Sequence, residues 1–206
     1  MSKKYTLHYF DGRGRGELIR LLFAMKDMSF EDDRIKFEDW PKLKARTPSG
    51  QLPYMVIGDK AFGQSIALAR FFAKEFGLYG KDNLSQLGID EILDDVVDFR
   101  NFNVKIMFEP DAEKKAELQK KLEEVTGPAF MKKMGKILSD NKTGFLVGNA
   151  CTVADVALFD IMNGMAMNPD AEKTFSTAPN VKAHMEKIQA IPGIKAWLDK
   201  RPTTQF

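Results

Sequence analysis

The stretch from Gly50 to Ser65, GQLPYMVIGDKAFGQS, decides how the first part of this chain folds. Two short apolar runs, Tyr54 to Ile57 and Lys60 to Phe62, stand on either side of Gly58-Asp59. A Gly-Asp pair between two apolar runs is typical of a β-hairpin turn. The stretch therefore predicts two adjacent antiparallel strands.

Both ends of this hairpin carry features that suit the binding of a peptide. Pro53 cannot donate to a sheet ladder, so it belongs at the mouth of the first strand and leaves the Leu52 backbone free to pair with another molecule. Ser65 precedes the apolar run Ile66 to Leu68, and we expect it to cap a helix whose free N–H groups attract a carboxylate. A hairpin and a capped helix that bind nothing would leave the same signals.

The segments around the hairpin predict a compact α/β unit. Strands are expected at residues 5–10 and 30–37, and helices at residues 17–26, just after Pro41, and at residues 65–76. Strands and helices that alternate in this way form a sheet covered by helices. The run from Gly77 to Asn83 breaks the pattern, so we place the first domain at residues 1–78 and a linker after it.

The remainder, residues 84–206, is predicted to be entirely helical. Apolar residues recur at helical spacing from Ile89 to Phe99, and Pro110 ends or kinks that helix. A long helix is expected at residues 112–138 with a bend at Gly127-Pro128, and two shorter ones at residues 180–190 and 194–200. Thr152 and Asp155 have the spacing of a helix capping box, which predicts a folding role for Asp155.

Charge and hydropathy exclude several classes of function. The 206 residues carry a formal net charge of +2, which gives no reason to expect nucleic acid or an anionic membrane as a partner. No apolar run approaches the roughly 18 to 20 residues of a membrane span, and MSKKYTLHYF at the start lacks the apolar core of a signal peptide. We expect a cytoplasmic protein.

Cysteine and histidine are too scarce for most metal or nucleophilic sites. Cys151 is the only cysteine, so no internal disulfide or cysteine-rich metal site can form. His8 and His184 are the only histidines, which removes most arrangements that use a histidine base or histidine ligands. The chemistry must come from tyrosine, serine, arginine, lysine or carboxylates, or arrive with the ligand.

The glycine loop FDGRGRGE after the first strand must be tested as a dinucleotide fingerprint. It follows a strand and opens a helix, as that motif requires. Glu17, however, occupies the place of the third glycine, and no further strand and helix repeats complete a dinucleotide-binding sheet. Tyr9, directly before this loop, would by itself be read as a half-buried strand tyrosine.

Several short motifs together carry a resemblance to a known family. They are, in chain order, Tyr9-Phe10, Arg15, Trp40 with Lys44, Gln51-Leu52-Pro53, Gln64-Ser65, FLVGN, TVAD and AIPGIKAWLDKRP. In this order, in an α/β unit joined to a helical one, they resemble the cytosolic glutathione transferases and specifically the sigma class. The resemblance covers essentially the whole chain.

The resemblance implies a thioredoxin-like first domain, a cis bond at Pro53, a homodimer, and glutathione as a cosubstrate with no tightly bound cofactor. The residues that it assigns to glutathione are Tyr9, Trp40, Lys44, Gln51, Leu52, Pro53, Gln64 and Ser65, with Asp98 contributed by the partner subunit. The Leu52 backbone would pair with the cysteinyl part, and Gln64 and Ser65 would hold the γ-glutamyl carboxylate. Trp40, Lys44 and Gln51 would meet the glycyl end.

Tyr9 is implied as the catalytic residue. A protonated phenol, with a reference pKa near 10, would donate a hydrogen bond to the glutathione sulfur. A hydrogen bond to an ionised acceptor contributes about 1.5 to 3 kcal/mol, enough to lower a thiol pKa from about 8.5 to about 7. Arg15 would add a positive field at the sulfur.

The partner of the thiolate is expected to be a small hydrophobic electrophile. Its pocket is assigned to Arg13, Gly14, Arg100, Asn103, Lys105, Ala157 and Ile161. Prostaglandin-forming relatives carry three carboxylates where Val97 interrupts Asp94 to Asp98 here, so no metal is predicted. Three alternatives stay open: an S-crystallin-like structural protein of the lens, a carrier of hydrophobic ligands, and a prostaglandin D synthase-type isomerase.

Overall fold

The computed structural model describes residues 4–165 and 177–204, and the chain divides into two compact units. The first unit comprises Met1–Tyr79 and Gln189–Phe206, and the second comprises Gly80–Ile188. The domain limits 1–78 and 84–206 stay a prediction, but residues 189–206 group by their contacts with the first unit. The reason is that helix α10 (Pro192–Lys200) packs on helix α1 (Glu17–Met25).

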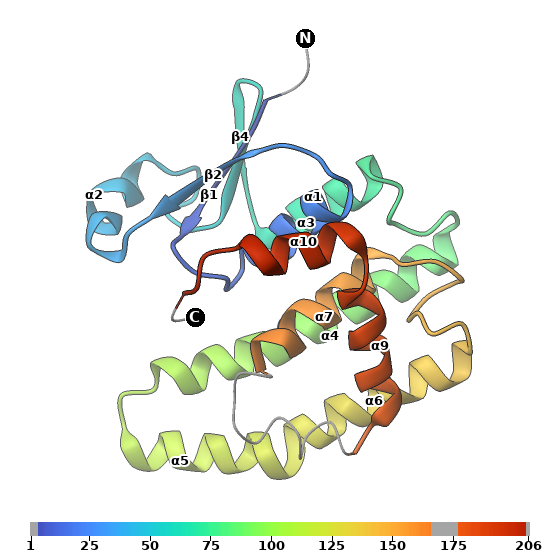
Figure 1. Ribbon diagram of the computed structural model, residues 1–206. Coiled ribbons are helices and arrows are strands. Elements are labelled where there is room, and N and C mark those ends of the chain that lie inside the picture. The colour runs from blue at the N-terminus through green and yellow to red at the C-terminus, as the bar shows by residue number, and fades with distance from the viewer. Residues whose placement is uncertain (1–3, 166–176, 205–206) are drawn as a thin grey trace. The chain divides into compact units, whose positions relative to one another are not determined.

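The first unit is built on a mixed four-stranded sheet in the order β2-β1-β3-β4 (Figure 1). The strands are β1 (Tyr5–Phe10), β2 (Glu31–Ile35), β3 (Tyr54–Ile57) and β4 (Lys60–Gly63). β1 runs parallel to β2 and antiparallel to β3, which pairs with β4 as the predicted hairpin. β2 is shorter than the expected 30–37, because residues 37–39 turn into a 3-10 helix.

The core of the first unit lies between the sheet and its helices. Leu7 and Met55 pair across β1 and β3, and neither side chain is exposed; Tyr5, on the same face of β1 as Leu7, contacts rings of α1 and α3 (Ser65–Glu75). The ring of Phe23 lies 4.7 Å from that of Phe72 and 5.5 Å from that of Tyr5, in edge contacts favourable to aromatic pairs. Figure 1 shows α1, α3 and α10 side by side next to the sheet. The thioredoxin-like fold class is thereby confirmed.

The hairpin stretch folds largely as its sequence predicts. Gly58 takes a positive φ of 65° between the paired residues Ile57 and Lys60, a conformation that glycine adopts readily. The bond between Leu52 and Pro53 is cis, as the resemblance implied.

The expected cap of α3 is wrong by one residue. Gln64 occupies the N-cap position with φ 67°, and Ser65 is the first helical residue. No side chain caps this helix end. The strand runs to Gly63, so the chain must turn into the helix within a single residue, and Gln64 takes the uncommon left-handed conformation there.

A short helical segment connects β2 to the hairpin. Helix α2 (Trp40–Leu43) lies between two 3-10 turns, η1 (Phe37–Asp39) and η2 (Lys44–Arg46). Pro41 sits at its start, where the missing N–H would have no partner within the helix.

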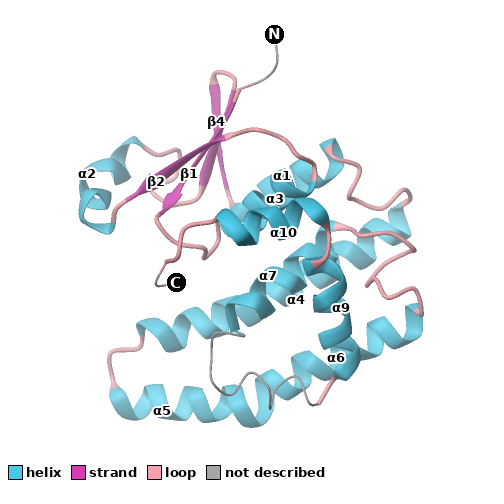
Figure 2. Ribbon diagram, viewed as in Figure 1, coloured by secondary structure: helices cyan, strands magenta, loops and turns pink. Residues whose placement is uncertain are grey.

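The second unit is helical, as Figure 2 shows. Its helices are α4 (Asn83–Phe108), α5 (Ala112–Lys121), α6 (Gly127–Asn141), α7 (Val153–Met165) and α9 (Pro179–Gln189). α4 begins with a capping box between Asp82 and Ser85 and ends two residues before Pro110. Hydrogen bonds from the Ser85 backbone and hydroxyl lower the pKa of Asp82. α4 packs on α7 through an apolar face that includes Leu93 and Val96.

The bend expected at Gly127-Pro128 takes the form of a wider helical turn. Residues 122–126 (η3) form a π-helical segment between α5 and α6. A Cβ at Gly127 would stand 2.8 Å from the Leu122 carbonyl oxygen. In a regular α-helix, the ring of Pro128 would clash with the carbonyl of residue 124. The wider turn at residues 122–126 relieves that clash.

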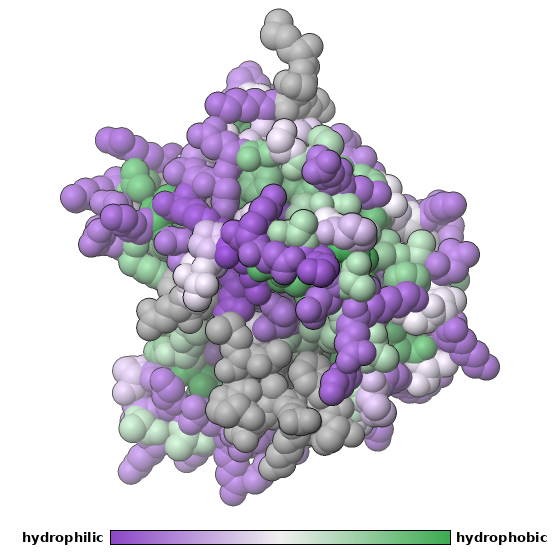
Figure 3. Space-filling view, in the orientation of Figure 1, coloured by the Kyte–Doolittle hydropathy of each residue, from purple (hydrophilic) through white to green (hydrophobic). Residues whose placement is uncertain are grey.

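The visible surface is mainly hydrophilic with smaller apolar areas (Figure 3). Within residues 4–165 and 177–204, no helix combines the length and the apolar character needed to cross a membrane.

Candidate active site

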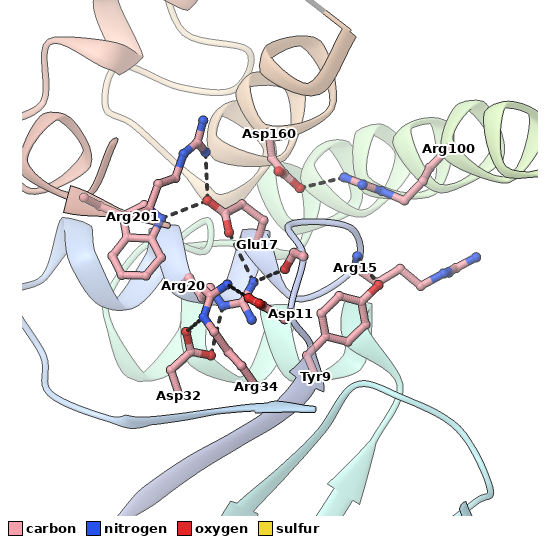
Figure 4. A network of polar contacts seen from close by, with 12 residues as sticks. Tyr9, Asp11, Arg15, Glu17, Arg20, Asp32, Arg34, Arg100, Asp160 and Arg201 are labelled. Carbon is pink, nitrogen blue, oxygen red and sulfur yellow. Dashed lines mark hydrogen bonds and ion pairs between the residues drawn. The ribbon is translucent and has the colours of Figure 1, made fainter. Parts of the chain in front are cut away.

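Tyr9 lies at the carboxyl end of β1 and is 7% exposed. The loop that follows turns directly over its hydroxyl group, and the Arg15 backbone N–H donates a hydrogen bond of 2.9 Å to Tyr9 Oη (Figure 4). An oxygen that accepts this bond can still donate its own proton outward. The bond fixes the hydroxyl oxygen of Tyr9 against the backbone of this loop.

Contact with Tyr9 explains the glycines of this loop. A Cβ at Gly14 or at Gly16 would collide with the Tyr9 side chain, at the hydroxyl for Gly14 and at the ring for Gly16. Gly14 also has a positive φ of 37°. Gly14 and Gly16 thus allow the loop backbone to lie against Tyr9. This packing role gives a second reason to reject the dinucleotide interpretation.

Strand register brings the hairpin ends next to Tyr9. His8 pairs with Tyr54 across β1 and β3, so Tyr9 and Pro53 follow at the next position. Tyr54 pairs in turn with Gly63, the residue before Gln64. The cis peptide and the start of α3 therefore lie at the same end of neighbouring strands as the tyrosine. A ligand backbone at this edge could pair with Leu52.

The α2 segment borders the same region. The Phe10 ring stacks on Phe37 at 4.2 Å and meets the Trp40 ring edge-on at 5.6 Å. Lys44 is exposed, and its Cε would lie 3.7 Å from a Cβ at Gly50, beside the loop that leads to Gln51. The eight residues assigned to glutathione from one subunit all belong to the first unit.

The residues expected around the electrophile are divided between the units. Arg13 and Gly14 belong to the first, whereas the other five lie on α4 and α7: Arg100, Asn103, Lys105, Ala157 and Ile161. Arg100 Nη2 lies 2.6 Å from Asp160 Oδ2, and Asn103 Nδ2 donates to the Phe99 carbonyl. Their grouping into one pocket stays a prediction.

Acidic residues of α4 make other contacts. Lys133 Nζ lies 2.6 Å from Asp95 and 2.9 Å from Glu91. Asp98 is exposed. The part of the chain that the structure describes contains no group of three side chains placed to hold a metal ion.

Both histidines pair with carboxylates. His8 Nδ1 lies 2.6 Å from Asp33 Oδ2, and its ring stacks on Tyr54 at 4.2 Å. Burial, followed by the Asp33 charge, raises the pKa of Tyr54. His184 is buried against Asp155 in the second unit. His8 thus belongs to the first unit and His184 to the second.

A buried polar network surrounds Glu17, and the sequence did not predict it. Its Oε1 accepts hydrogen bonds of 2.8 Å from Trp197 Nε1 and from Arg201 Nη1 (Figure 4). Arg20, three residues further along α1, lies 3.4 Å from its Oε2. The available signal was an i, i+3 Glu–Arg pair in an otherwise apolar helix.

Together, the thioredoxin-like sheet with its cis-proline, the tyrosine beside it and the helical second unit define a transferase that uses a thiol peptide. Residues 5–74 match the family described as "Glutathione S-transferase, N-terminal domain", and residues 97–201 match "Glutathione S-transferase, C-terminal domain". The chain therefore belongs to the glutathione S-transferase family and is a glutathione transferase.

Individual relatives extend over nearly the whole chain. "Probable glutathione S-transferase 5" of Caenorhabditis elegans is 37% identical and covers 98% of this chain and 99% of its own. "S-crystallin SL11" of Nototodarus sloanii is 35% identical, with 98% of both chains covered. The solved structure of prostaglandin synthase D of Nilaparvata lugens superposes with a TM-score of 0.91 at 33% identity, covering 98% of this chain and all of that one.

Proposed function

We propose that the Tyr9 hydroxyl donates a hydrogen bond to the sulfur of bound glutathione and stabilises its thiolate, which then attacks small hydrophobic electrophiles. The observation that carries this proposal is the 2.9 Å bond from the Arg15 N–H to Tyr9 Oη. That bond holds the hydroxyl oxygen in place near the end of β1, and a protonated phenol can accept one hydrogen bond and donate another. In the attack on an aryl halide, the sulfur forms a bond to the electrophilic carbon, the carbon–halogen bond breaks and halide leaves, and the thiol proton has already passed to solvent.

Recognition of glutathione follows from the chemistry of the surrounding residues. The Leu52 backbone pairs with the cysteinyl part. Gln64 and Ser65 hold the γ-glutamyl carboxylate at the start of α3, where free N–H groups favour an anion. Trp40, Lys44 and Gln51 meet the glycyl end, with Lys44 supplying a positive charge. The exposure of Lys44 and the shared strand edge of Tyr9, Pro53 and Gln64 support this arrangement.

The protein acts as a cytoplasmic homodimer of the sigma class, without a tightly bound cofactor or metal. Asp98 reaches the glutathione of the partner subunit, a role for which its exposure on α4 is suitable. Light scattering at micromolar concentration should give the mass of two subunits, and a single-subunit mass would remove this role.

The decisive experiment compares the wild type with Tyr9→Phe in conjugation of a chromogenic aryl halide between pH 5.5 and 8. We expect turnover to follow ionisation of the bound thiol near neutral pH, and to fall about tenfold or more in the variant with glutathione binding retained. Unchanged turnover in Tyr9→Phe would refute the mechanism.

The relatives include an S-crystallin and a prostaglandin synthase, and a carrier of hydrophobic ligands is a third alternative. A wild type that binds glutathione tightly but conjugates no electrophile would favour an S-crystallin-like structural role or a carrier. Formation of prostaglandin D would favour the synthase activity for which the Nilaparvata structure is named.

A further inference from the structure

Glu17 is a buried carboxylate that joins the first helix to the end of the chain. Its side chain is 1% exposed, and its Oε1 accepts bonds of 2.8 Å from both Trp197 and Arg201. A buried carboxylate is costly unless cations and hydrogen-bond donors surround it. Arg20 and Arg201 supply the charge, and Trp197 supplies a neutral donor.

The loop that contacts Tyr9 is hydrogen-bonded at one end to Arg20 and leads at its other end into Glu17. At the near end, Arg20 Nη1 donates to the Gly12 carbonyl. At the far end, the backbone N–H groups of Gly16 and Glu17 donate to the Arg13 carbonyl at 3.1 and 2.9 Å. The position of the loop therefore depends on the positions of Glu17 and Arg20.

The Arg15 N–H lies inside this loop, two residues before Glu17. The anchor and the Tyr9 hydrogen bond are connected through one turn of backbone. Because hydrogen bonds weaken steeply with distance and angle, a small shift of α1 would weaken the bond to Tyr9 Oη. Displacements near 1 Å at a catalytic group reduce rates by about a hundredfold.

We propose that Glu17, held by Trp197 and Arg201, is a positioning residue that sets the geometry of the Arg15–Tyr9 hydrogen bond and thereby the ionisation of the bound thiol. The inference rests on the proposed role of Tyr9. It assigns to the C-terminal segment a part in tuning the thiol, through contacts made entirely inside the first unit.

The test measures the ionisation of bound glutathione by thiolate absorbance against pH in Trp197→Phe, which keeps a ring but removes the indole N–H. We expect the apparent thiol pKa to rise by roughly half a unit, which is about threefold less thiolate at lower pH. kcat/KM at pH 6.5 should fall by a similar factor, with little change in the KM for glutathione. Glu17→Gln should shift the same profile in the same direction.

A matched control separates positioning from simple destabilisation. Ile194→Val, in the same helix and fully buried, should lower the melting temperature without moving the thiol pKa. Asp199→Asn, which breaks only an exposed pair with Lys195, should change neither.

A double variant distinguishes the two proposals. In a Tyr9→Phe background, Trp197→Phe should give no further rise in the thiol pKa, because its effect passes through the phenol. A shift by Tyr9→Phe with none from Trp197→Phe or Glu17→Gln would overturn this inference alone. No shift from Tyr9→Phe would overturn both proposals.

Discussion

A Cβ on Gly16 would stand 2.6 Å from Cδ1 of Tyr9, because the loop backbone lies directly against the tyrosine ring. Gly16 has a φ of −86°, which any residue can adopt. Contact with the ring, and not backbone conformation, is therefore what requires glycine here. The position of the Tyr9 phenol therefore depends on the absence of a side chain at residue 16.

The variant Gly16→Ala should displace the Tyr9 ring and reduce kcat/KM by about 10- to 100-fold, with a loss of about 1 to 3 kcal/mol in stability from overpacking. Steady-state conjugation and thermal unfolding measure the two effects. Gly164→Ala is the control, because a Cβ there meets no atom of residues 4–165 and 177–204 within 4 Å and alanine favours a helix. Full activity of Gly16→Ala would show that Tyr9 tolerates displacement.

Replacement of Lys44 by Gln should raise the KM for glutathione about tenfold and leave kcat nearly unchanged. In the proposed site, the Lys44 ammonium attracts the glycyl carboxylate equally strongly in the bound substrate and in the transition state, so its loss weakens binding without slowing the chemical step. The exposed neighbour Arg46 provides the control, since Arg46→Gln removes the same charge from the same 3-10 turn. Equal effects of the two changes would indicate general attraction of an anion instead of a specific contact.

The buried Asp155 accepts four hydrogen bonds, and Asp155→Asn should lower the free energy of unfolding by about 2 to 5 kcal/mol. The donors are the Leu146 N–H, the Thr152 N–H and hydroxyl, and His184 Nε2, at 2.7 to 2.9 Å. An amide has one acceptor oxygen, so about two donors would lose their partners.

Urea unfolding gives the measurement for Asp155→Asn. Asp140→Asn serves as the control, because its pair with Lys136 is exposed and should contribute less than about 1 kcal/mol. A similar small effect at both positions would contradict the role of Asp155 as the folding centre of the second unit.

Hydrogen bonds to Asp95 and then to Glu91 raise the pKa of Lys133 above its ordinary value of 10.5. Because the pKa is higher in the folded state, the stabilisation is fully present below pH 10.5 and is lost as the pH rises through the folded pKa. Lys133 is 42% exposed, so solvent screening limits the effect to about 0.2 to 1 kcal/mol.

Urea unfolding of the wild type and Lys133→Met between pH 8 and 12 checks this. The difference in stability should shrink toward the alkaline end and in high salt, whereas Lys136→Met should show little difference throughout. A difference that persists at pH 12 would mean that packing of the side chain, and not its charge, is responsible.

Local patterns in the sequence predicted most of the secondary structure. Alternation at residues 5–10, the Gly58-Asp59 turn and the helical spacing from Ile89 onward each reflect interactions between near neighbours in the chain. Errors occurred at the edges, as at Ser65, where the conformation of Gln64 decides which residue begins the helix. Strand ends and helix caps depend on turns whose geometry the surrounding fold imposes.

The features of the candidate site likewise divide into those that the sequence predicts and those that only the tertiary structure shows. The sequence by itself determined the residue types and the α/β and helical halves, because motifs and periodicity are local. It pointed to Tyr9 as the proposed catalytic residue only through the family resemblance. Only the tertiary structure decided that Gly14 and Gly16 lie against Tyr9 and that Glu17 meets Trp197 some 180 residues later. Such contacts leave no periodic trace in the sequence, since they require only that the two residues meet in the folded chain.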